Sequence, residues 1–167
     1  MLGFSVKPGT RDDLPFLETM LSYAADWREE TPRAVEAFAD DRVLQRYVAG
    51  WSRIGDAAVL AEDADGARLG AAWYRLFSPD EPGYGFVASE IPELSLAVER
   101  RVRRQGVGAA LLEALVERAR TDGYRALSLS VEHGNEARRL YDRAGFVVHQ
   151  VSGGSTTMTL DLAPRPD

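Results

Sequence analysis

The apolar positions along the chain follow two periods, and each period predicts one kind of element. Alternating apolar and polar residues between turn residues predict strands. Apolar residues three or four positions apart, bounded by capping residues or glycine, predict helices. We expect strands at residues 4–7, 57–61, 69–77, 93–98, 126–131, 146–151 and 156–162. We expect helices at residues 14–21, 32–48, 106–119 and 135–145.

The order of these elements limits the fold. One strand and two helices come first, then three strands, then helix, strand, helix and a final strand pair. This order predicts a mixed sheet with helices on both faces, in an α/β or α+β arrangement. No repeat, low-complexity tract or linker divides the chain, and a mass of 18.4 kDa is enough for a full core. We therefore expect a single domain over residues 1–167.

Composition excludes several classes of protein. The chain has no Cys, which excludes disulfide scaffolds, thiolate zinc sites and a Cys nucleophile, and fits a reducing compartment. Its two His are too few for a His-rich metal centre, so no metal is expected. No apolar run approaches the ~20 residues of a membrane span, and the net charge of −6 disfavours nucleic-acid binding. A cytoplasmic, soluble protein that binds neither nucleic acid nor membrane is expected.

One basic segment departs from this acidic average. Strand 93–98 leads into four arginines within five positions, and Gly106 and Gly108 then open a helix. The first N–H groups of a helix have no internal partners and lie at the positive end of its dipole. Glycine lets a ligand approach such groups closely, and arginines add charge-assisted hydrogen bonds. The arginines are Arg100, Arg101, Arg103 and Arg104. The segment therefore predicts binding of a polyphosphate or a phosphate-bearing cofactor.

Other phosphate-binding motifs fit this segment less well. A P-loop needs Lys-Ser/Thr after its last glycine, where this chain has Ala109-Ala110. A dinucleotide fingerprint needs a third Gly or Ala where Leu111 stands. Two further readings stay open: a nucleotide-binding module unrelated to coenzyme A, and glycines that only form a tight turn beside arginines exposed to solvent.

Two blocks of the chain resemble the GNAT superfamily of N-acetyltransferases. Residues 94–112 resemble its acyl-CoA-binding core, in which Arg103-x-x-Gly106-x-Gly108 matches the signature R/Q-x-x-G-x-G/A. Residues 135–146, NEARRLYDRAGF, resemble the family segment that begins with Asn and ends in L-Y-x-x-x-G-F. One helix and one strand separate the two blocks, as in the family, whereas residues 1–90 match only in outline.

The resemblance implies a mostly antiparallel central sheet in which strand 94–98 splays from strand 126–131 to form a cleft for acetyl-CoA. The pantetheine arm would bind the strand backbone and Asn135, and the pyrophosphate would bind residues 103–109. Tyr141 would lie near the thioester sulfur. The implied cofactor-binding residues are Leu96, Ala97, Val98, Arg103, Arg104, Gln105, Gly106, Val107, Gly108, Ala109, Asn135 and Tyr141.

Acetyl transfer needs a general base, because an amine of pKa about 10.4 is mostly protonated at neutral pH. The resemblance assigns this role to Glu93, acting through water, with Glu90 as second choice, and assigns protonation of the leaving thiolate to Tyr141. Each residue also has a structural interpretation. Glu93 could be an exposed carboxylate at a strand end, and Tyr141 could pack in the core on the apolar face of its helix.

The resemblance places Trp27, Tyr84 and Phe86 on the acceptor side, although all three could simply be aromatic cover for the core. The expected acceptor is a small-molecule amine or a peptide amine, and the family allows a homodimer. A second functional hypothesis is a non-catalytic acyl-CoA sensor that regulates a partner protein. Such a sensor would keep residues 103–109 and would not need Glu93 or Tyr141.

Overall fold

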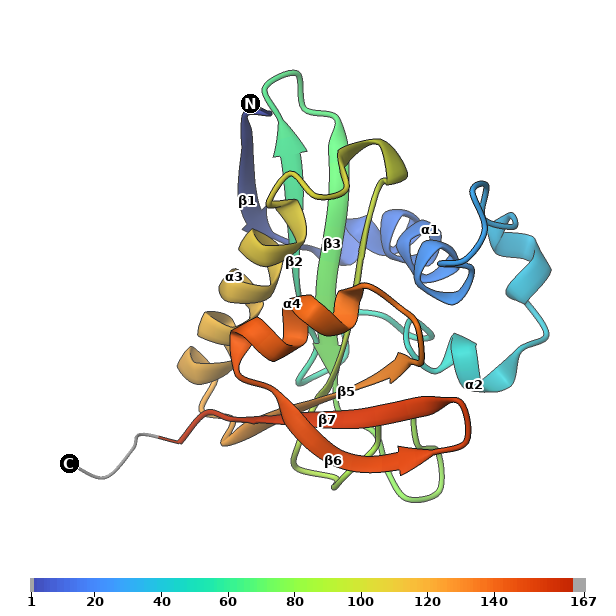
Figure 1. Ribbon diagram of the computed structural model, residues 1–167, viewed down its shortest axis with the longest axis vertical. Helices are drawn as coiled ribbons and strands as arrows, with labels where there is room; N and C mark the ends of the chain where they lie inside the picture. The colour runs from blue at the N-terminus through green and yellow to red at the C-terminus, as the bar shows by residue number, and fades with distance from the viewer. Residues whose placement is uncertain (1, 164–167) are drawn as a thin grey trace.

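A seven-stranded sheet forms the centre of the structure, a computed structural model that describes residues 2–163 (Figure 1). Its spatial order is β1-β2-β3-β4-β5-β7-β6, and within the described residues only β4 and β5 pair in parallel. The strands are β1 (Phe4–Pro8), β2 (Ala57–Asp63), β3 (Arg68–Arg75), β4 (Glu93–Val98), β5 (Ala126–Glu132), β6 (Val147–Ser152) and β7 (Ser155–Asp161). The predicted mixed, mostly antiparallel sheet is confirmed.

Helices cover both faces of this sheet. They are α1 (Leu14–Ala25), α2 (Arg42–Gln45), α3 (Val107–Thr121) and α4 (Ala137–Ala144). Alternate residues of β2 show the two layers, since side chains alternate along a strand. Ala57 and Val59 pack with α3 and α4, whereas Ala58 and Leu60 pack with α1 and the α2 region. Figure 1 shows α3 and α4 in front of the sheet and α1 behind it. The predicted α/β class is confirmed.

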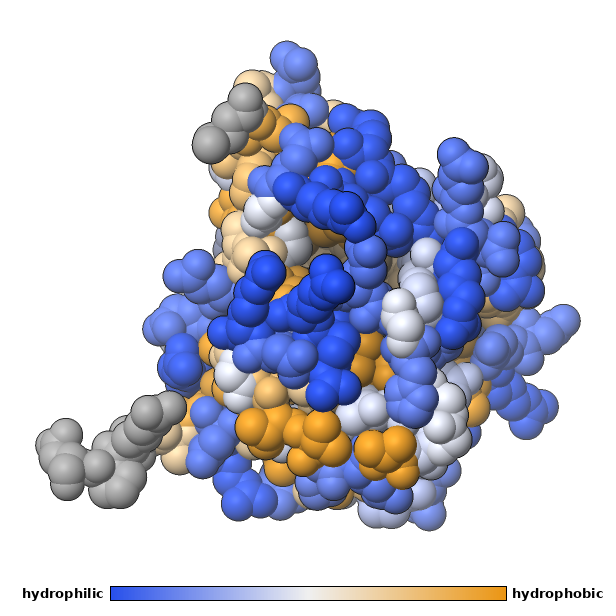
Figure 2. Space-filling view, viewed as in Figure 1, coloured by the Kyte–Doolittle hydropathy of each residue, from blue (hydrophilic) through white to orange (hydrophobic). Residues whose placement is uncertain are grey.

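β6 is the outer strand at one edge of the sheet, and its residues are exposed. Val147, Val148 and Val151 are its large exposed apolar side chains. Figure 2 shows an apolar patch in the lower part of the view, where Figure 1 places β6. The exposed valines of β6 therefore form an apolar patch at the edge of the sheet away from β1. No helix within residues 2–163 is both long and apolar enough to cross a membrane.

A local cap fixes the start of α1. The Thr10 amide donates to Asp13 Oδ2 at 2.7 Å, and the Thr10 hydroxyl accepts from the Asp12 amide at 3.3 Å. This capping box closes a 3-10 turn (Arg11–Asp13) that leads directly into α1.

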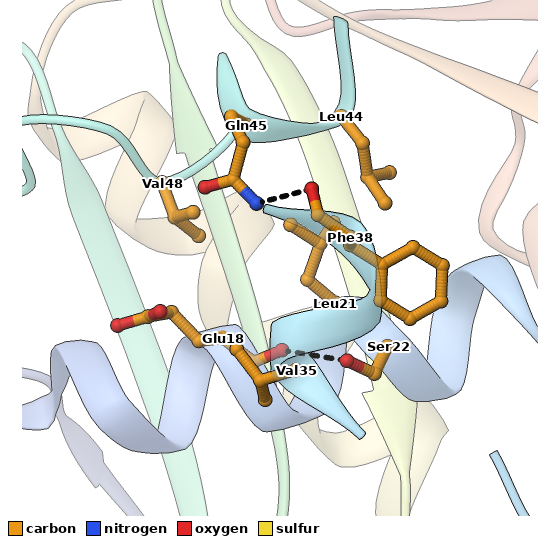
Figure 3. A pocket seen from close by; sticks show the side chains of 8 residues that line it. All are labelled: Glu18, Leu21, Ser22, Val35, Phe38, Leu44, Gln45 and Val48. Atoms are coloured by element: carbon orange, nitrogen blue, oxygen red, sulfur yellow. Dashed lines mark hydrogen bonds between the residues drawn. The ribbon is translucent and has the colours of Figure 1, made fainter. Parts of the chain in front are cut away.

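The single helix predicted for residues 32–48 is wrong. The structure has a 3-10 helix (Val35–Phe38) and then the short α2. Asp41 starts a new helix because its Oδ1 accepts from the Leu44 amide at 3.0 Å. Gln45 Nε2 donates to the Phe38 carbonyl at 2.9 Å, which holds the two short helices together against α1 (Figure 3). A local cap thus overrides the helical period.

The two helices of the second half lie close to their predicted ranges. α3 begins after Gly106, whose φ of +86° favours glycine. α4 begins at Ala137, and the cap comes from just outside the helix, where Asn135 Oδ1 accepts from the Ala137 amide at 2.9 Å. Gly145 ends α4 with a φ of +98°.

Candidate active site

β4 and β5 separate soon after they meet. Within the described residues their ladder is the single pair Glu93–Ser128, supported by a 3.0 Å hydrogen bond from the Ser128 amide to the Pro92 carbonyl. β4 meanwhile stays paired with β3 along its whole length. The predicted splay is confirmed, and it leaves one edge of β4 without a strand partner.

The register of β3 and β4 decides which backbone groups face this opening. Alternate residues of an antiparallel ladder turn their N–H and C=O groups toward the partner strand. Glu99 donates to the Leu69 carbonyl at 2.7 Å, so the odd-numbered residues of β4 turn toward β3. Leu96 and Val98 therefore turn their backbone groups toward the opening. Ala97 was also expected there, but the structure pairs its backbone with Ala71 of β3.

The start of α3 lies beside this open edge. Arg104 and Gly106 have positive φ angles of 61° and 86°, and no side chain of residues 2–163 caps the first amides of the helix. A left-handed residue followed by helical residues points successive N–H groups into one concave site, which suits an anion. The first helical residue, Val107, has its side chain buried in the core, so only its backbone can serve a ligand.

Gly108 lies between the open strand and α4. A Cβ built there would be 3.4 Å from Leu140 Cδ2 and 3.9 Å from Leu96 Cδ2, both ordinary van der Waals distances. The protein's own packing therefore does not require glycine at this position. A ligand lying on the backbone would require it, so the residues present fit a phosphate-bearing cofactor with an extended arm.

The arginines of this segment have different surroundings. Arg100 is turned away from the helix start: its Nη2 donates to the Asp26 carbonyl at 2.7 Å and its Nε to the Glu29 carbonyl at 3.1 Å. Arg103 stays near α3, where partial burial and the charge of Arg100 lower its pKa. Arg104 pairs with Glu136 at 2.7 Å.

Three more residues expected to bind the cofactor lie near the start of α3 or α4. The Gln105 side chain donates to the Arg101 carbonyl at 3.2 Å, and Ala109 is exposed on the first turn of α3. Asn135 stands next to Glu136, and so to the Arg104 ion pair. Its Oδ1 is used by the Ala137 amide, which leaves the side-chain NH₂ as its available donor.

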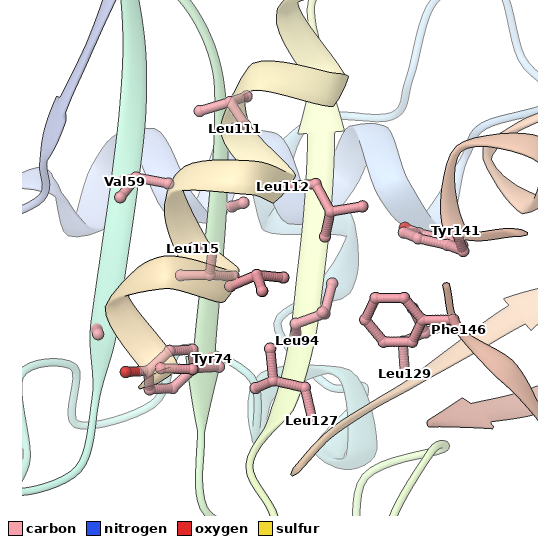
Figure 4. Close-up of a cluster of buried hydrophobic side chains, with 14 of the residues drawn as sticks. Val59, Tyr74, Leu94, Leu111, Leu112, Leu115, Leu127, Leu129, Tyr141 and Phe146 are labelled. Atoms are coloured by element: carbon pink, nitrogen blue, oxygen red, sulfur yellow. The ribbon is translucent and has the colours of Figure 1, made fainter. Parts of the chain in front are cut away.

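Tyr141 lies in the core between α3 and β5. It is 5% exposed, and its ring packs edge-on against Phe146 with centroids 5.8 Å apart (Figure 4). Burial raises the pKa of the hydroxyl well above its ordinary value, which keeps it protonated. The expected packing is present, and the hydroxyl keeps its proton at neutral pH.

Glu93 is buried rather than exposed at the strand end. It is 2% exposed, and the Tyr47 hydroxyl donates to its Oε2. Burial raises the pKa of Glu93 to about 7, although the hydrogen bond from Tyr47 and the nearby Gly85 amide act in the opposite direction. Glu90, the second choice, is on the surface and pairs with Arg125 at 3.1 Å. A carboxylate that titrates near neutral pH suits a general base.

Tyr47 is the residue of this site that the sequence did not indicate. Its hydroxyl donates to Glu93 and accepts from the Tyr84 amide at 2.8 Å, so it links the carboxylate to the β3–β4 loop. Its carbonyl accepts from Trp73 Nε1 at 3.0 Å. Tyr47 belongs to residues 1–90, which resemble the family only in outline, and no local motif identifies it.

The three aromatic residues expected on the acceptor side lie at different distances from Glu93. Tyr84 is 59% exposed and stacks on Tyr47 with centroids 6.3 Å apart. Phe86 is half-buried against the core beside α1. Trp27 lies at the far end of β5, where its Nε1 donates to Glu132 at 3.1 Å. The structure therefore brings Tyr84 to Glu93 and keeps Trp27 apart from it.

Glu93 and Tyr141 lie on opposite faces of the sheet. Glu93 bonds to Tyr47, a member of the core cluster beside α1, whereas its neighbour Leu94 packs in the Tyr141 cluster. The two residues expected to be catalytic are therefore separated by the sheet, Glu93 on the α1 face and Tyr141 on the α3 face. Within residues 2–163, no cluster of three His, Asp or Glu side chains is placed to hold a metal ion.

An open strand edge beside a glycine-marked helix start suits an extended ligand that carries phosphate. Residues 19–146 match the family model described as acetyltransferase (GNAT) family. The chain therefore belongs to the GNAT acetyltransferase family.

Two curated relatives are L-methionine sulfoximine/L-methionine sulfone acetyltransferases from Pseudomonas aeruginosa and Pseudomonas paraeruginosa. Each is 38% identical over 98 residues, which cover 58% of this chain and 54% of the relative. The chain thus matches about half the length of these curated relatives.

Solved structures share the fold along almost the whole chain. A ribosomal-protein-alanine N-acetyltransferase from Brucella melitensis is 26% identical, with a TM-score of 0.63 over 94% of this chain and 99% of the other. A GCN5-related N-acetyltransferase from Kribbella flavida is 23% identical, with a TM-score of 0.68 over 95% and 98%. A structure from Salmonella typhimurium with its cofactor acetyl-CoA is 21% identical, with a TM-score of 0.65 over 99% and 97%.

Proposed function

We propose that this chain transfers an acetyl group from acetyl-CoA to the amine of an acceptor by direct attack on the thioester. One observation carries the proposal: an open β4 edge beside the start of α3, with the buried Glu93 on the opposite face. A binding edge alone would suit a sensor. A carboxylate held in the protein with a pKa of about 7 favours a catalyst.

In the proposed complex, the backbone groups of Leu96 and Val98 bind the pantetheine arm as a strand binds its neighbour. The first amides of α3 hold the pyrophosphate, and Arg103 and Arg104 add charge-assisted hydrogen bonds. The Asn135 side-chain NH₂ donates to the same arm in this proposal.

Acetyl-CoA supplies the thioester carbonyl that the amine attacks. Glu93 accepts the proton of the acceptor ammonium through water, and a base of pKa about 7 does so efficiently near neutral pH. Backbone N–H groups of β4 stabilise negative charge on the carbonyl oxygen. Tyr141 then donates its proton to the departing thiolate.

The acceptor is proposed only as a class, a small-molecule or peptide amine. Tyr84 and Tyr47 line the approach to Glu93, and half-buried Phe86 lies on the same face. The names of the curated relatives make L-methionine sulfoximine and L-methionine sulfone sensible members of an acceptor panel, beside polyamines, amino sugars and peptides.

Binding of the donor is tested first, by thermal shift with acetyl-CoA, ATP and NAD. A ligand at 100 times its Kd adds about 2.7 kcal/mol, which corresponds to roughly 5–11 °C at this chain length. We expect a shift with acetyl-CoA alone. Gly108→Val should abolish it by filling the opening, whereas Gly3→Val, at an exposed position with open space around it, should keep it. A shift with ATP or NAD but none with acetyl-CoA would refute the proposal.

Turnover is tested next, by thiol release from acetyl-CoA with the acceptor panel. We expect release with at least one amine, and a loss of about 10²-fold or more in Glu93→Gln with acetyl-CoA binding retained. Binding of acetyl-CoA without release for any acceptor would instead support the sensor.

A further inference from the structure

Two unpartnered polar atoms belong to the residue pair at the base of the opening. Within residues 2–163, the buried side-chain polar atoms without a hydrogen-bond partner are Glu93 Oε1, Ser128 Oγ and Arg100 Nη1. The first two belong to the one pair that joins β4 to β5. Buried polar atoms are nearly always hydrogen-bonded, so two orphans on one strand pair indicate a missing common partner.

Both side chains point to the same face of the sheet. Directly paired residues on neighbouring strands share a face, and the strands are about 4.8 Å apart. Glu93 faces the α1 side, where Tyr47 binds its other oxygen. On β5, Leu127 and Leu129 pack in the opposite cluster, which places Ser128 on the Glu93 side. Ser128 is completely buried, so bulk water does not satisfy its hydroxyl.

The β3–β4 loop packs closely over this pair. A Cβ on Gly83 would collide with Glu93 Oε1, and a Cβ on Gly85 would come within 2.5 Å of the Leu129 carbonyl carbon. Glycine at both positions lets the loop backbone approach the pair closely, and neither position adds a side chain of its own. The Gly85 amide also lies near the Glu93 carboxylate.

No cation neutralises Glu93 among the described residues. Arg75 is its direct neighbour on β3, but the Arg75 guanidinium is bound by Asp56 at 2.7 Å and by the Ala49 carbonyl at 2.7 Å. The other titratable groups nearby are the hydroxyl of Tyr47, on Oε2, and the side chain of Tyr84, which lies outside Tyr47. A neutral group that both donates and accepts therefore fits the two orphans, and water is the smallest such group.

We propose that Ser128 is a positioning residue for acetyl transfer, because its hydroxyl and Glu93 Oε1 hold one water molecule between them. The proposal rests on the proposed function. In the proton-transfer step, the N–H bond of the acceptor ammonium breaks and its proton passes to this water. The water gives one of its protons to Oε1, so the amine becomes nucleophilic, Glu93 becomes neutral and the water is unchanged.

Ser128→Ala tests the kinetic consequence. The variant leaves the water with one anchor fewer, which weakens its hydrogen bond to ionised Glu93 and makes the base harder to ionise. We expect the acid limb of the kcat/KM profile to move up by about half to one pH unit, with KM for acetyl-CoA unchanged. Ser128→Thr, which keeps the hydroxyl, should restore the wild-type midpoint. Ser130→Ala, two residues further along the same face, should leave it unmoved.

A second measurement is independent of turnover. The Glu93 carboxyl carbon is titrated by NMR in the free protein and assigned by its loss in Glu93→Gln. We expect its midpoint to rise in Ser128→Ala and to stay in Ser130→Ala. Equal midpoints in wild type and Ser128→Ala would overturn the role of Ser128, whatever the activity. A raised midpoint in a protein that acetylates no amine would sustain the polar site and refute the proposed function.

Discussion

Tyr141 is packed like a core residue, and the same packing fixes the protonation state of its hydroxyl. The ring lies against Phe146, and burial is the cause that raises its pKa. A phenol in water has a pKa of about 10 and a thiol about 8.5, so proton donation to a thiolate is already uphill for the phenol. A raised pKa makes Tyr141 a weaker acid that is nevertheless protonated at every working pH, so its role depends on position more than on acidity.

Removing only this hydroxyl separates the two interpretations of Tyr141. In Tyr141→Phe the ring still fills the core, so we expect a melting temperature close to wild type and an unchanged KM for acetyl-CoA. We expect kcat to fall about 10²-fold, because the thiolate loses its proton donor. Steady-state thiol release at saturating acetyl-CoA measures this.

Tyr124→Phe is the matched control for this substitution. The Tyr124 hydroxyl donates to the Gly55 carbonyl at 3.4 Å, beyond the C-terminal end of α3 and away from the opening. Its loss should leave kcat unchanged. A wild-type kcat in Tyr141→Phe would mean that Tyr141 is a packing residue only.

At the scale of elements, the sequence predicts well those helices whose ends are set by residues close by in the sequence. α3 and α4 combine helical spacing with a glycine at or near each end, and both lie close to the predicted ranges. The helix expected over residues 32–48 fails because Asp41 caps a new helix inside it. The pairs Tyr47–Glu93 and Glu93–Ser128 join residues 46 and 35 positions apart. Strand order and loop packing create them, and no local pattern contains that information.

The ion pair between Arg104 and Glu136 joins the start of α3 to the start of α4. Both side chains are well exposed, 80% and 63%, so the pair contributes little to folding stability. We expect the ion pair to affect cofactor binding instead, because Glu136 binds the Arg104 guanidinium that the proposed pyrophosphate site would use. We expect Glu136→Gln to lower the Kd for acetyl-CoA by about two- to fivefold at low salt, because Arg104 is then free to bind the phosphates.

Isothermal titration calorimetry at two salt concentrations measures this effect. The gain should shrink at high salt, where charges on the surface are screened. Glu113→Gln, at an exposed position on α3, changes the net charge equally and is the control. If both variants tighten binding alike, net charge rather than the release of Arg104 is the cause.

At the scale of the whole molecule, the candidate site uses both faces of the sheet. The sequence predicts its phosphate-binding end, because a strand, the arginines and a helix start follow one another along the chain. It does not predict that Glu93 and Tyr141 lie on opposite faces. That arrangement depends on strand register, since a shift of one residue would move every side chain of β4 to the other face.

The stability of the molecule should depend on pH through Glu93. Its ordinary pKa is 4.5 and burial raises it to about 7 in the folded protein. Below pH 4.5 the carboxyl is protonated in both states, and the folded state has its full stability. Between pH 4.5 and 7 the unfolded chain loses the proton while the folded chain keeps it, so the free energy of unfolding falls as pH rises. Above pH 7 the loss is complete, at about 3 kcal/mol.

Glu93→Gln removes this titration while keeping an acceptor for the Tyr47 hydroxyl. We therefore expect the variant to be as stable as wild type near pH 4 and more stable near pH 8, by up to about 3 kcal/mol. Urea unfolding at both pH values gives the two differences. Glu90→Gln, whose side chain is exposed, should show no such change with pH. An equal stability difference at both pH values would mean that Glu93 has the same pKa in the folded and the unfolded protein, and that burial does not raise it.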